Sequence, residues 1–255
     1  MSRIFITGST DGLGYAAARD LIEDGHEVLL HARSQSRAAD LGDLASQSAG
    51  VVIGDLSSTV ETHKVAEQVN RIGRMDAVIH NAGIYRVPNR STTAEGHART
   101  LAVNTLAPYI LTTQIERPRR LIYLSSDMHR SGSSSFDDVD WLKRPWDQTQ
   151  AYCDSKLFVT ALAFAVARLW PEVLSNAVDP GWVPTKMGGA GATDDLALGH
   201  LTQTWLAVSD DPAVAVSGRY WHHRQVHTPA APVMDSELDE RLMGILATLT
   251  GVSLL

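Results

Sequence analysis

The stretch that decides the fold is Thr7-Gly8-Ser9-Thr10-Asp11-Gly12-Leu13-Gly14, which follows the apolar run Ile4-Phe5-Ile6 and precedes a segment with helical periodicity. Gly8 allows a tight turn, Gly12 lets backbone N–H groups approach a pyrophosphate, and Gly14 permits close packing of helix against strand. The N-terminus of the helix then faces the anion. Three glycines alone also fit an ordinary strand–helix turn, but at the start of a βαβ pattern they predict dinucleotide binding. The predicted contacts in this loop are Gly8, Ser9, Gly12, Leu13 and Gly14.

The rest of the chain repeats the alternation of strand and helix. Apolar runs at 28–30, 51–53, 77–79, 121–124 and 175–178 have two apolar faces, as buried parallel strands do. Helical segments lie near residues 15–24, 37–47, 60–71, 94–113 and 150–169. Each right-handed crossover between parallel strands needs such a helix. The pattern predicts a single α/β domain over residues 1–255, with a doubly wound parallel sheet of the Rossmann type.

Composition narrows the class of protein. The chain has 255 residues, 44% of them hydrophobic, which suits one α/β domain with a sizeable core. The formal net charge of −7 repels phosphate backbones, so no nucleic-acid partner is expected. One cysteine, Cys153, excludes an intramolecular disulfide and fits a reducing compartment. We expect a cytoplasmic protein without signal peptide or membrane partner, because Arg3–Thr7 already forms a core strand and the longest apolar stretch, Leu157–Ala167, is too short to span a bilayer.

The end of the second predicted strand bears on the choice of dinucleotide. An acidic residue there usually binds the adenosine ribose hydroxyls of NAD, but here Ala32 occupies that position and Arg33 follows. A guanidinium suits the 2′-phosphate of NADP(H) through charge-assisted hydrogen bonds. The sequence therefore predicts NADP(H), held mainly by Arg33 and assisted by Arg37, with solvated surface arginines as the alternative.

Tyr152 and Lys156 stand at i and i+4 in a predicted helix, so they share one face. A tyrosine has a pKa of about 10, and a nearby ammonium lowers that pKa because it stabilises the phenolate. Such a pair can exchange a proton with a carbonyl or alcohol oxygen. Taken alone, the pattern also fits an ordinary pair on a helix surface.

In combination these residues resemble the short-chain dehydrogenases/reductases. The matching pieces run in family order from residue 3 to about 186: Thr-Gly-x-x-x-Gly-x-Gly at 7–14, Asp55-Leu56, Asn81-Ala82-Gly83, Asn104, Ser125-Ser126, Tyr152-x-x-x-Lys156, and Pro180-Gly181 with Thr185. The resemblance implies reversible hydride transfer between NADP(H) and a carbonyl/alcohol pair. In such a reaction the hydride belongs to the cofactor, while the protein orients and polarises.

The resemblance also implies roles for individual residues. Ser126 would bind the substrate oxygen, Tyr152 would donate or accept the proton, and Lys156 would bind the nicotinamide ribose and lower the tyrosine pKa. Asn104 would hold a water in a proton relay. The remaining cofactor contacts would be Asp55, Leu56, Asn81, Ala82, Gly83, Pro180, Gly181, Val183 and Thr185.

The spacing between Ser126 and Tyr152 is 26 residues, longer than the family's usual spacing. Together with Ser-Ser-x-x-His at 125–129 and the residues around Tyr152, this spacing resembles the retinol-dehydrogenase-like branch, which favours NADP(H) and apolar carbonyls or alcohols. We expect an insertion at about 127–149. The same alignment selects Ser126 over Ser125 as the catalytic serine.

Residues after the Pro-Gly turn are candidates for substrate contact. Trp182 and Met187 lie where the family's substrate loop begins, at about 185–200, and are predicted to line an apolar pocket. His222, His223 and His227 are not accompanied by a cysteine, so no metal site is predicted.

Three alternatives stay open. An extended-type epimerase or dehydratase needs a C-terminal substrate domain, for which residues 186–255 leave little room. A non-catalytic dinucleotide-sensing protein tends to lose the tyrosine or the lysine, and both are present. A homodimer could use the apolar helix after Lys156, although the insertion could cover it.

Overall fold

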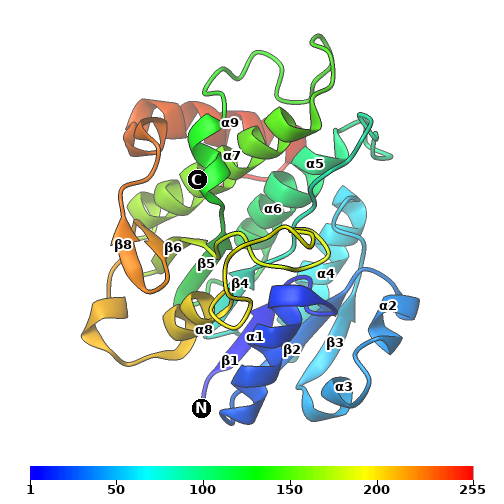
Figure 1. Cartoon of the computed structure of the whole chain (residues 1–255), viewed down its shortest axis with the longest axis vertical. Helices are drawn as coiled ribbons and strands as arrows, with labels where there is room; N and C mark the ends of the chain where they lie inside the picture. The colour runs from blue at the N-terminus through cyan, green and yellow to red at the C-terminus, as the bar shows by residue number, and fades with distance from the viewer. Residues whose placement is uncertain (255) are drawn as a thin grey trace.

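The strands of the computed structural model, which describes residues 1–254, form one sheet in the order β3-β2-β1-β4-β5-β6-β7-β8 (Figure 1). Strands β1 to β7 pair in parallel and β8 adds antiparallel to β7. Their bounds are β1 Arg3–Ile6, β2 Glu27–Ala32, β3 Gly50–Ile53, β4 Ala77–His80, β5 Arg120–Leu124, β6 Leu174–Asp179, β7 Arg219–His222 and β8 Gln225–His227. The predicted doubly wound sheet is confirmed, and its order reverses between β1 and β4, where such sheets bind ligands.

Two hydrophobic layers cover the sheet. On one face α1 (Gly12–Glu23), α3 (Asp43–Gln47) and α8 (Leu201–Val208) pack on alternate strand residues, among them Ile4 and Ile6. On the other face α4 (Thr59–Ile72), α6 (Ala107–Gln114), α7 (Gln148–Leu169) and α9 (Ser236–Thr250) surround Phe5 and Tyr123. Strand residues alternate between the two clusters because successive side chains of a strand point to opposite faces.

Two predicted helices differ from the structure. The segment near 37–47 is split into α2 (Gln35–Ala39) and α3, because the chain turns at Gly42 with φ of +53°. The helix predicted from residue 94 begins only with α5 (Arg99–Leu101), since Thr92 and Ala98 pair as an isolated β-bridge. It continues through a π-helical turn, Ala102–Leu106, into α6. Helix α6 ends at Gln114, just before β5.

The apolar helix α7 is buried from Ala151 to Val166. It lies between the sheet and α9, which packs along it (Figure 1). Its start also carries the segment 132–147, which follows a 3-10 turn, Asp127–Ser131. Helix α9 therefore covers part of α7.

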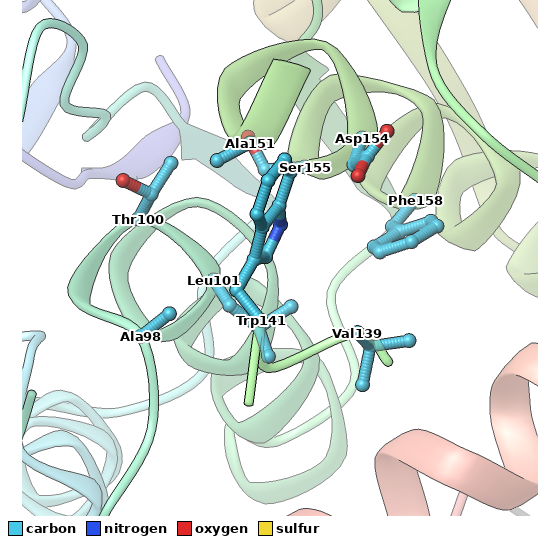
Figure 2. A pocket seen from close by; sticks show the side chains of 9 residues that line it. All are labelled: Ala98, Thr100, Leu101, Val139, Trp141, Ala151, Asp154, Ser155 and Phe158. Carbon is cyan, nitrogen blue, oxygen red and sulfur yellow. The ribbon is translucent and has the colours of Figure 1, made fainter. Parts of the chain in front are cut away.

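The segment 132–147 is held to the body by side chains rather than by regular structure. Asp140 accepts hydrogen bonds from the backbone N–H of Ala98 at 2.9 Å and from His97 Nδ1 at 2.8 Å. Arg144 lies over the Trp141 ring and pairs with Asp154 of α7 at 2.6 Å. Figure 2 shows Trp141 standing beside Ser155 and Leu101, in a cavity of about 10 Å³ between the segment and the helices. Such a cavity holds about one water molecule.

Candidate active site

The glycine loop between β1 and α1 has the conformation that its sequence predicts. Gly8 and Gly12 have φ of +66° and +52°, in the left-handed region where a side chain is strained. A Cβ added at Gly14 would collide with the Gly8 carbonyl and the Asn81 amide, so helix and strand approach as closely as the motif requires. Ser9 is fully buried, and its hydroxyl bonds the Ile6 carbonyl at 3.0 Å. The Ser9 side chain therefore supports the loop and is unavailable to a cofactor.

A buried histidine braces the same loop. His31 Nδ1 accepts a hydrogen bond from the Gly8 N–H at 2.9 Å, so its proton sits on Nε2 and is donated to the Gly54 carbonyl at 2.9 Å. Burial lowers the pKa of His31 to about 4, which keeps the imidazole neutral. No sequence signal indicates this role, because a histidine in a core strand has no characteristic pattern.

The two arginines predicted for the adenosine end lie differently. Arg33 is exposed just beyond β2 and has no partner among the residues described. Arg37 reaches the glycine loop, donating to Thr10 Oγ1 at 3.1 Å and lying 3.7 Å from an Asp11 carboxylate oxygen. Lys186 from the substrate loop binds Asp11 at 2.5 Å, and this hydrogen bond holds the pKa of Asp11 below its usual value. Two cations therefore converge on the carboxylate beside the glycine loop.

The other predicted cofactor residues gather at the carboxyl ends of the parallel strands, the edge at which such sheets bind ligands. Asn81 donates to the carbonyls of Thr7 and Gly8, and the Ala82 N–H donates to Thr7 Oγ1 at 3.0 Å. A Cβ at Gly83 would lie 3.6 Å from Lys156 Nζ, so this backbone passes close to the ammonium. Asp55 and Leu56 follow β3, while Pro180, Gly181, Val183 and Thr185 follow β6 and line the main cavity.

That cavity has a volume of about 1020 Å³ and is walled by Leu13, Tyr85, Ser126, Tyr152, Trp182 and Met187, among others. The structure therefore brings together the predicted serine, the predicted tyrosine and both predicted substrate residues. Trp182 and Met187 are 52% and 37% exposed and stand at its rim. The Trp182 indole donates to the Gly188 carbonyl at 3.0 Å, which folds the substrate loop back on itself.

Tyr152 lies in the first turns of α7 with its ring against Tyr85, at a centroid distance of 4.5 Å. Burial raises the pKa of Tyr152 strongly, and a hydrogen bond with Ser126 lowers it by less. Lys156 Nζ lies 5.5 Å from the Tyr152 ring centroid and donates to the Leu124 carbonyl at 2.6 Å. Burial lowers the pKa of Lys156 to about 8. The two groups share one face of α7, as their spacing predicts.

The two adjacent serines have different surroundings. Ser125 is buried beneath α7, where its hydroxyl bonds Thr160 Oγ1 at 2.6 Å. Ser126 lines the cavity, contacts Tyr152 and accepts from the Met128 N–H at 3.3 Å as the 3-10 turn begins. The geometry therefore favours Ser126 as the serine that meets a substrate.

Asn104 sits in the π-helical turn and is buried. Its amide donates to the Ile84 carbonyl and to Ser155 Oγ, both at 3.0 Å, and its Oδ1 accepts from the Ile84 N–H at 2.8 Å. The side chain thus ties the loop after β4 to α7 on the far side of Lys156. Single π-helical turns recur at functional sites because they displace the hydrogen-bond ladder.

The cavity lining includes Tyr85, Asp179 and Tyr220, which the sequence does not predict, and the equally unpredicted His129 packs against Tyr220 behind the wall. His129 Nε2 accepts from the Ala230 N–H at 2.9 Å, so Nδ1 carries the proton and donates to the Ser126 carbonyl at 2.8 Å. Asp179 and Tyr220 line the same cavity as Trp182. Asp179 and Tyr220 come together through the parallel pairing of β6 with β7, so they could be predicted only once the register of these strands is known.

The histidines near β8 do not form a metal site in the part of the chain that is described. His222 stacks against His223 and His227, with ring centroids 3.9 Å and 5.6 Å apart. Over residues 1–254, no group of three or more histidine, cysteine, aspartate or glutamate side chains has the arrangement of a metal site. His222 and His227 line the cavity instead. None of the helices described is both long and apolar enough to cross a bilayer.

Comparisons with known proteins agree with this geometry. A family model for the short chain dehydrogenases matches residues 2–195. The chain is 41% identical to a short-chain dehydrogenase of Penicillium rubens, chyC, over 100% of this chain and 99% of that protein. It is 29% identical to human retinol dehydrogenase 13, over 98% of this chain and 84% of the human protein.

A crystal structure of a Mycobacterium paratuberculosis protein superimposes with a TM-score of 0.82 at 22% identity, covering 100% of this chain and 95% of the other. This likeness establishes the fold. The resemblance to the retinol-dehydrogenase-like branch, drawn from the sequence, is confirmed by the relatives. The chain belongs to the short-chain dehydrogenase family, and it is an oxidoreductase of the class that acts on CH–OH and C=O groups.

Proposed function

We propose that this chain interconverts a carbonyl and an alcohol with NADP(H), using Tyr152 as general acid and base. The observation that carries the proposal is the meeting of Ser126 and Tyr152 at the wall of a cavity of about 1020 Å³, with Lys156 Nζ buried 5.5 Å from the Tyr152 ring centroid. Cavities of this size accommodate a small organic molecule beside a cofactor. The apolar part of the wall, with Trp182 and Met187, suits an apolar substrate body.

The cradle fits a dinucleotide. Gly8 and Gly12 have the left-handed conformation that exposes backbone N–H groups, and α1 begins at Gly12 with its positive end toward the loop. The remainder of the dinucleotide would be lined by Asp55, Leu56, Asn81, Ala82, Gly83, Pro180, Gly181, Val183 and Thr185. The cofactor supplies the hydride when bound.

The preference for NADP(H) rests on the two arginines. Ala32 removes the acidic group that would repel a 2′-phosphate, and Arg33 is exposed and uncommitted beside it. Arg37 adds a second guanidinium at the glycine loop. A phosphate monoester carries nearly two negative charges at neutral pH, so both cations favour it over a ribose hydroxyl.

Each of four residues has a separate role in the reduction of the substrate carbonyl. In the direction of reduction, Ser126 binds the carbonyl oxygen and Tyr152 donates its phenolic proton to that oxygen. Lys156 stabilises the resulting phenolate, because an ammonium in a buried site interacts strongly with a neighbouring negative charge. Asn104 holds Ser155 and the loop after β4, and thereby positions the face of α7 that carries both groups.

A screen of aldehydes, ketones, quinones and alcohols tests the proposal, with NADPH absorbance as the readout and NADH as comparator. We expect turnover with NADPH that is lost in Tyr152→Phe. Dinucleotide binding without turnover of any compound would instead favour a non-catalytic sensor. The extended-type alternative gains no support, because residues 236–250 form α9 on α7 and add no second domain to the part of the chain described.

A further inference from the structure

One part of the cavity wall is built by the ends of β6 and β7. In their parallel pairing Ala177 lies opposite Tyr220 and Asp179 lies opposite His222. Residues two apart on a strand share a face, so Asp179, Tyr220 and His222 all point to the side of the sheet that carries α7. All three line the same cavity as Ser126 and Tyr152.

The hydroxyl of Tyr220 is buried and unpaired. Tyr220 is 2% exposed and packs against His129 with ring centroids 4.7 Å apart. Its Oη lies beside the Asp179 carboxylate, but neither this carboxylate nor any other atom of the described residues forms a hydrogen bond of ordinary length and angle with it. Burial and the Asp179 charge both raise the pKa of Tyr220, so the phenol remains protonated and is a donor. A buried donor without an acceptor costs about 1–3 kcal/mol, which a ligand atom can recover.

The Asp179 carboxylate offers the complementary acceptor. One of its oxygens accepts from the Gly181 N–H at 3.0 Å, and the other lies 3.6 Å from His222 Nδ1. Two carboxylate oxygens have about four lone-pair sites, so acceptor capacity remains on the cavity side. The nearby Asp127 differs, because Arg130 already binds it at 2.6 Å.

We propose that Tyr220 and Asp179 form a second binding subsite, the Tyr220–Asp179 subsite, which recognises a hydroxyl group of the substrate other than the reacting one. A hydroxyl accepts from the phenol and donates to the carboxylate at the same time. A substrate carboxylate would be repelled by Asp179, and an ammonium has no lone pair for Tyr220. The inference deepens the proposed function and rests on it, since it assigns the substrate class: a carbonyl compound with an apolar body and a separate hydroxyl.

The test compares pairs of naphthaldehydes that carry either a hydroxymethyl or an ethyl group at the same ring position. The two groups have nearly the same size, and the methylene limits any effect on the reactivity of the carbonyl. A hydrogen bond to a charged group is worth about 1.5–3 kcal/mol, or roughly ten- to a hundredfold. We expect at least one hydroxymethyl isomer to exceed its ethyl partner about tenfold in kcat/KM, mainly through KM.

The variant Tyr220→Phe should bring that ratio close to one. Tyr109→Phe is the matched control, because it removes a buried phenol that donates to Val252 outside the cavity, and it should keep the wild-type ratio. Tyr220→Phe removes no hydrogen bond of ordinary geometry from the folded chain, so its Tm should equal or exceed that of the wild type. A structural role for the phenol would lower the Tm instead.

The same pairs are titrated into the protein without cofactor by calorimetry, so that binding is measured even if no compound is turned over. Absence of turnover with a tenfold preference in Kd would contradict the proposed function and leave the subsite supported. Equal Kd and equal kcat/KM within every pair would overturn the subsite. A hydroxymethyl preference that survives in Tyr220→Phe would overturn it as well.

Discussion

Tyr152 has a high pKa in the absence of cofactor, because its ring is buried and the charges of Asp179 and Tyr85 disfavour the phenolate. The Ser126 hydroxyl offsets this only in part. The proton therefore stays on Tyr152 until a substrate oxygen arrives. Lys156 is the buried cation that can then stabilise the negative charge that develops on the Tyr152 oxygen. This arrangement suits a proton donor to a carbonyl oxygen.

Tyr152→Phe should fold and bind NADPH with an unchanged Kd, but lose turnover by about 10²–10⁴-fold, the usual worth of general acid–base catalysis. The ring and its packing on Tyr85 remain, and only the proton is removed. Steady-state kinetics on the best substrate of the carbonyl screen, together with a fluorescence titration of NADPH, provides the measurement. Rates near those of the wild type would contradict the assignment.

Ser126→Ala should lower kcat/KM far more than Ser125→Ala. Ser126 contacts Tyr152 at the cavity wall, whereas Ser125 is engaged with Thr160 beneath α7. Ser125→Ala should instead reduce the free energy of unfolding by about 1 kcal/mol, because it deletes one buried hydrogen bond. Kinetics and urea unfolding of both variants separate the two roles, and the opposite order of activities would transfer the catalytic role to Ser125.

Arg33→Ala and Arg37→Ala should each weaken NADPH binding about tenfold or more, since a charge-assisted hydrogen bond is worth about 1.5–3 kcal/mol. NADH, which lacks the 2′-phosphate, should be affected much less. The double change Ala32→Asp with Arg33→Ala should shift the preference toward NADH. Dissociation constants for both cofactors are the measurement, and equal wild-type affinity for the two would refute the role of the arginines.

At the scale of single elements, the 3-10 turn Asp127–Ser131 connects the catalytic serine to the C-terminal part of the chain. His129 hydrogen-bonds on one side to Ser126 and on the other to Ala230, and its ring packs on Tyr220. Burial lowers the pKa of His129, so the imidazole is neutral and keeps one donor and one acceptor. One side chain thereby ties the start of the turn to the segment that carries Ala230.

His129→Phe should lower kcat on the best carbonyl substrate about tenfold or more while the Kd of NADPH changes little. A phenyl ring fills the space but leaves the Ala230 N–H unpaired, at a cost of about 1–3 kcal/mol. It also removes one of the two donors to the Ser126 carbonyl, which keeps the backbone N–H of residue 129 at 3.0 Å. His129→Asn, which retains a donor and an acceptor, should recover part of the activity. If the two variants had equal kcat, the hydrogen bonds would not position Ser126.

The elements show why some of the site could be predicted and some could not. The glycine loop, Tyr152 and Lys156 lie at fixed short spacings within one strand–turn–helix or one helix, so the sequence alone places them together. Tyr220 and Asp179 are brought together only by the pairing of β6 with β7. Arg37 fits an ordinary helix-surface role equally well by sequence, and its contact with Thr10 of the glycine loop appears only in the folded chain.

For the molecule as a whole, buried neutral histidines should govern the stability below neutral pH. Burial lowers the pKa of His31 to about 4 and that of His80 to about 3, whereas an unfolded histidine titrates near 6.5. Below pH 6.5 the unfolded chain takes up protons that the folded chain does not, so stability falls as the pH decreases. The contribution of His31 alone reaches about 3 kcal/mol by pH 4.

His97 acts in the opposite direction, because its hydrogen bond to Asp140 raises the pKa of His97. Its contribution is complete below pH 6.5 and disappears as the pH rises through the folded pKa. Urea unfolding between pH 8 and pH 4.5 should therefore show a net fall in stability on the acidic side. A free energy of unfolding that is constant from pH 6.5 to pH 5 would contradict the neutral state of the buried histidines.

The single cysteine makes local opening around the start of α7 measurable as a rate of thiol labelling. Cys153 is the residue next to Tyr152, is 3% exposed, and burial raises the pKa of its thiol. A thiol reagent can reach it only when the structure around the start of α7 opens locally, so its labelling rate reports how often that region opens. Because no other thiol exists in the chain, every labelled molecule records one such opening. A ligand that binds only the closed state should therefore lower the labelling rate as its occupancy rises.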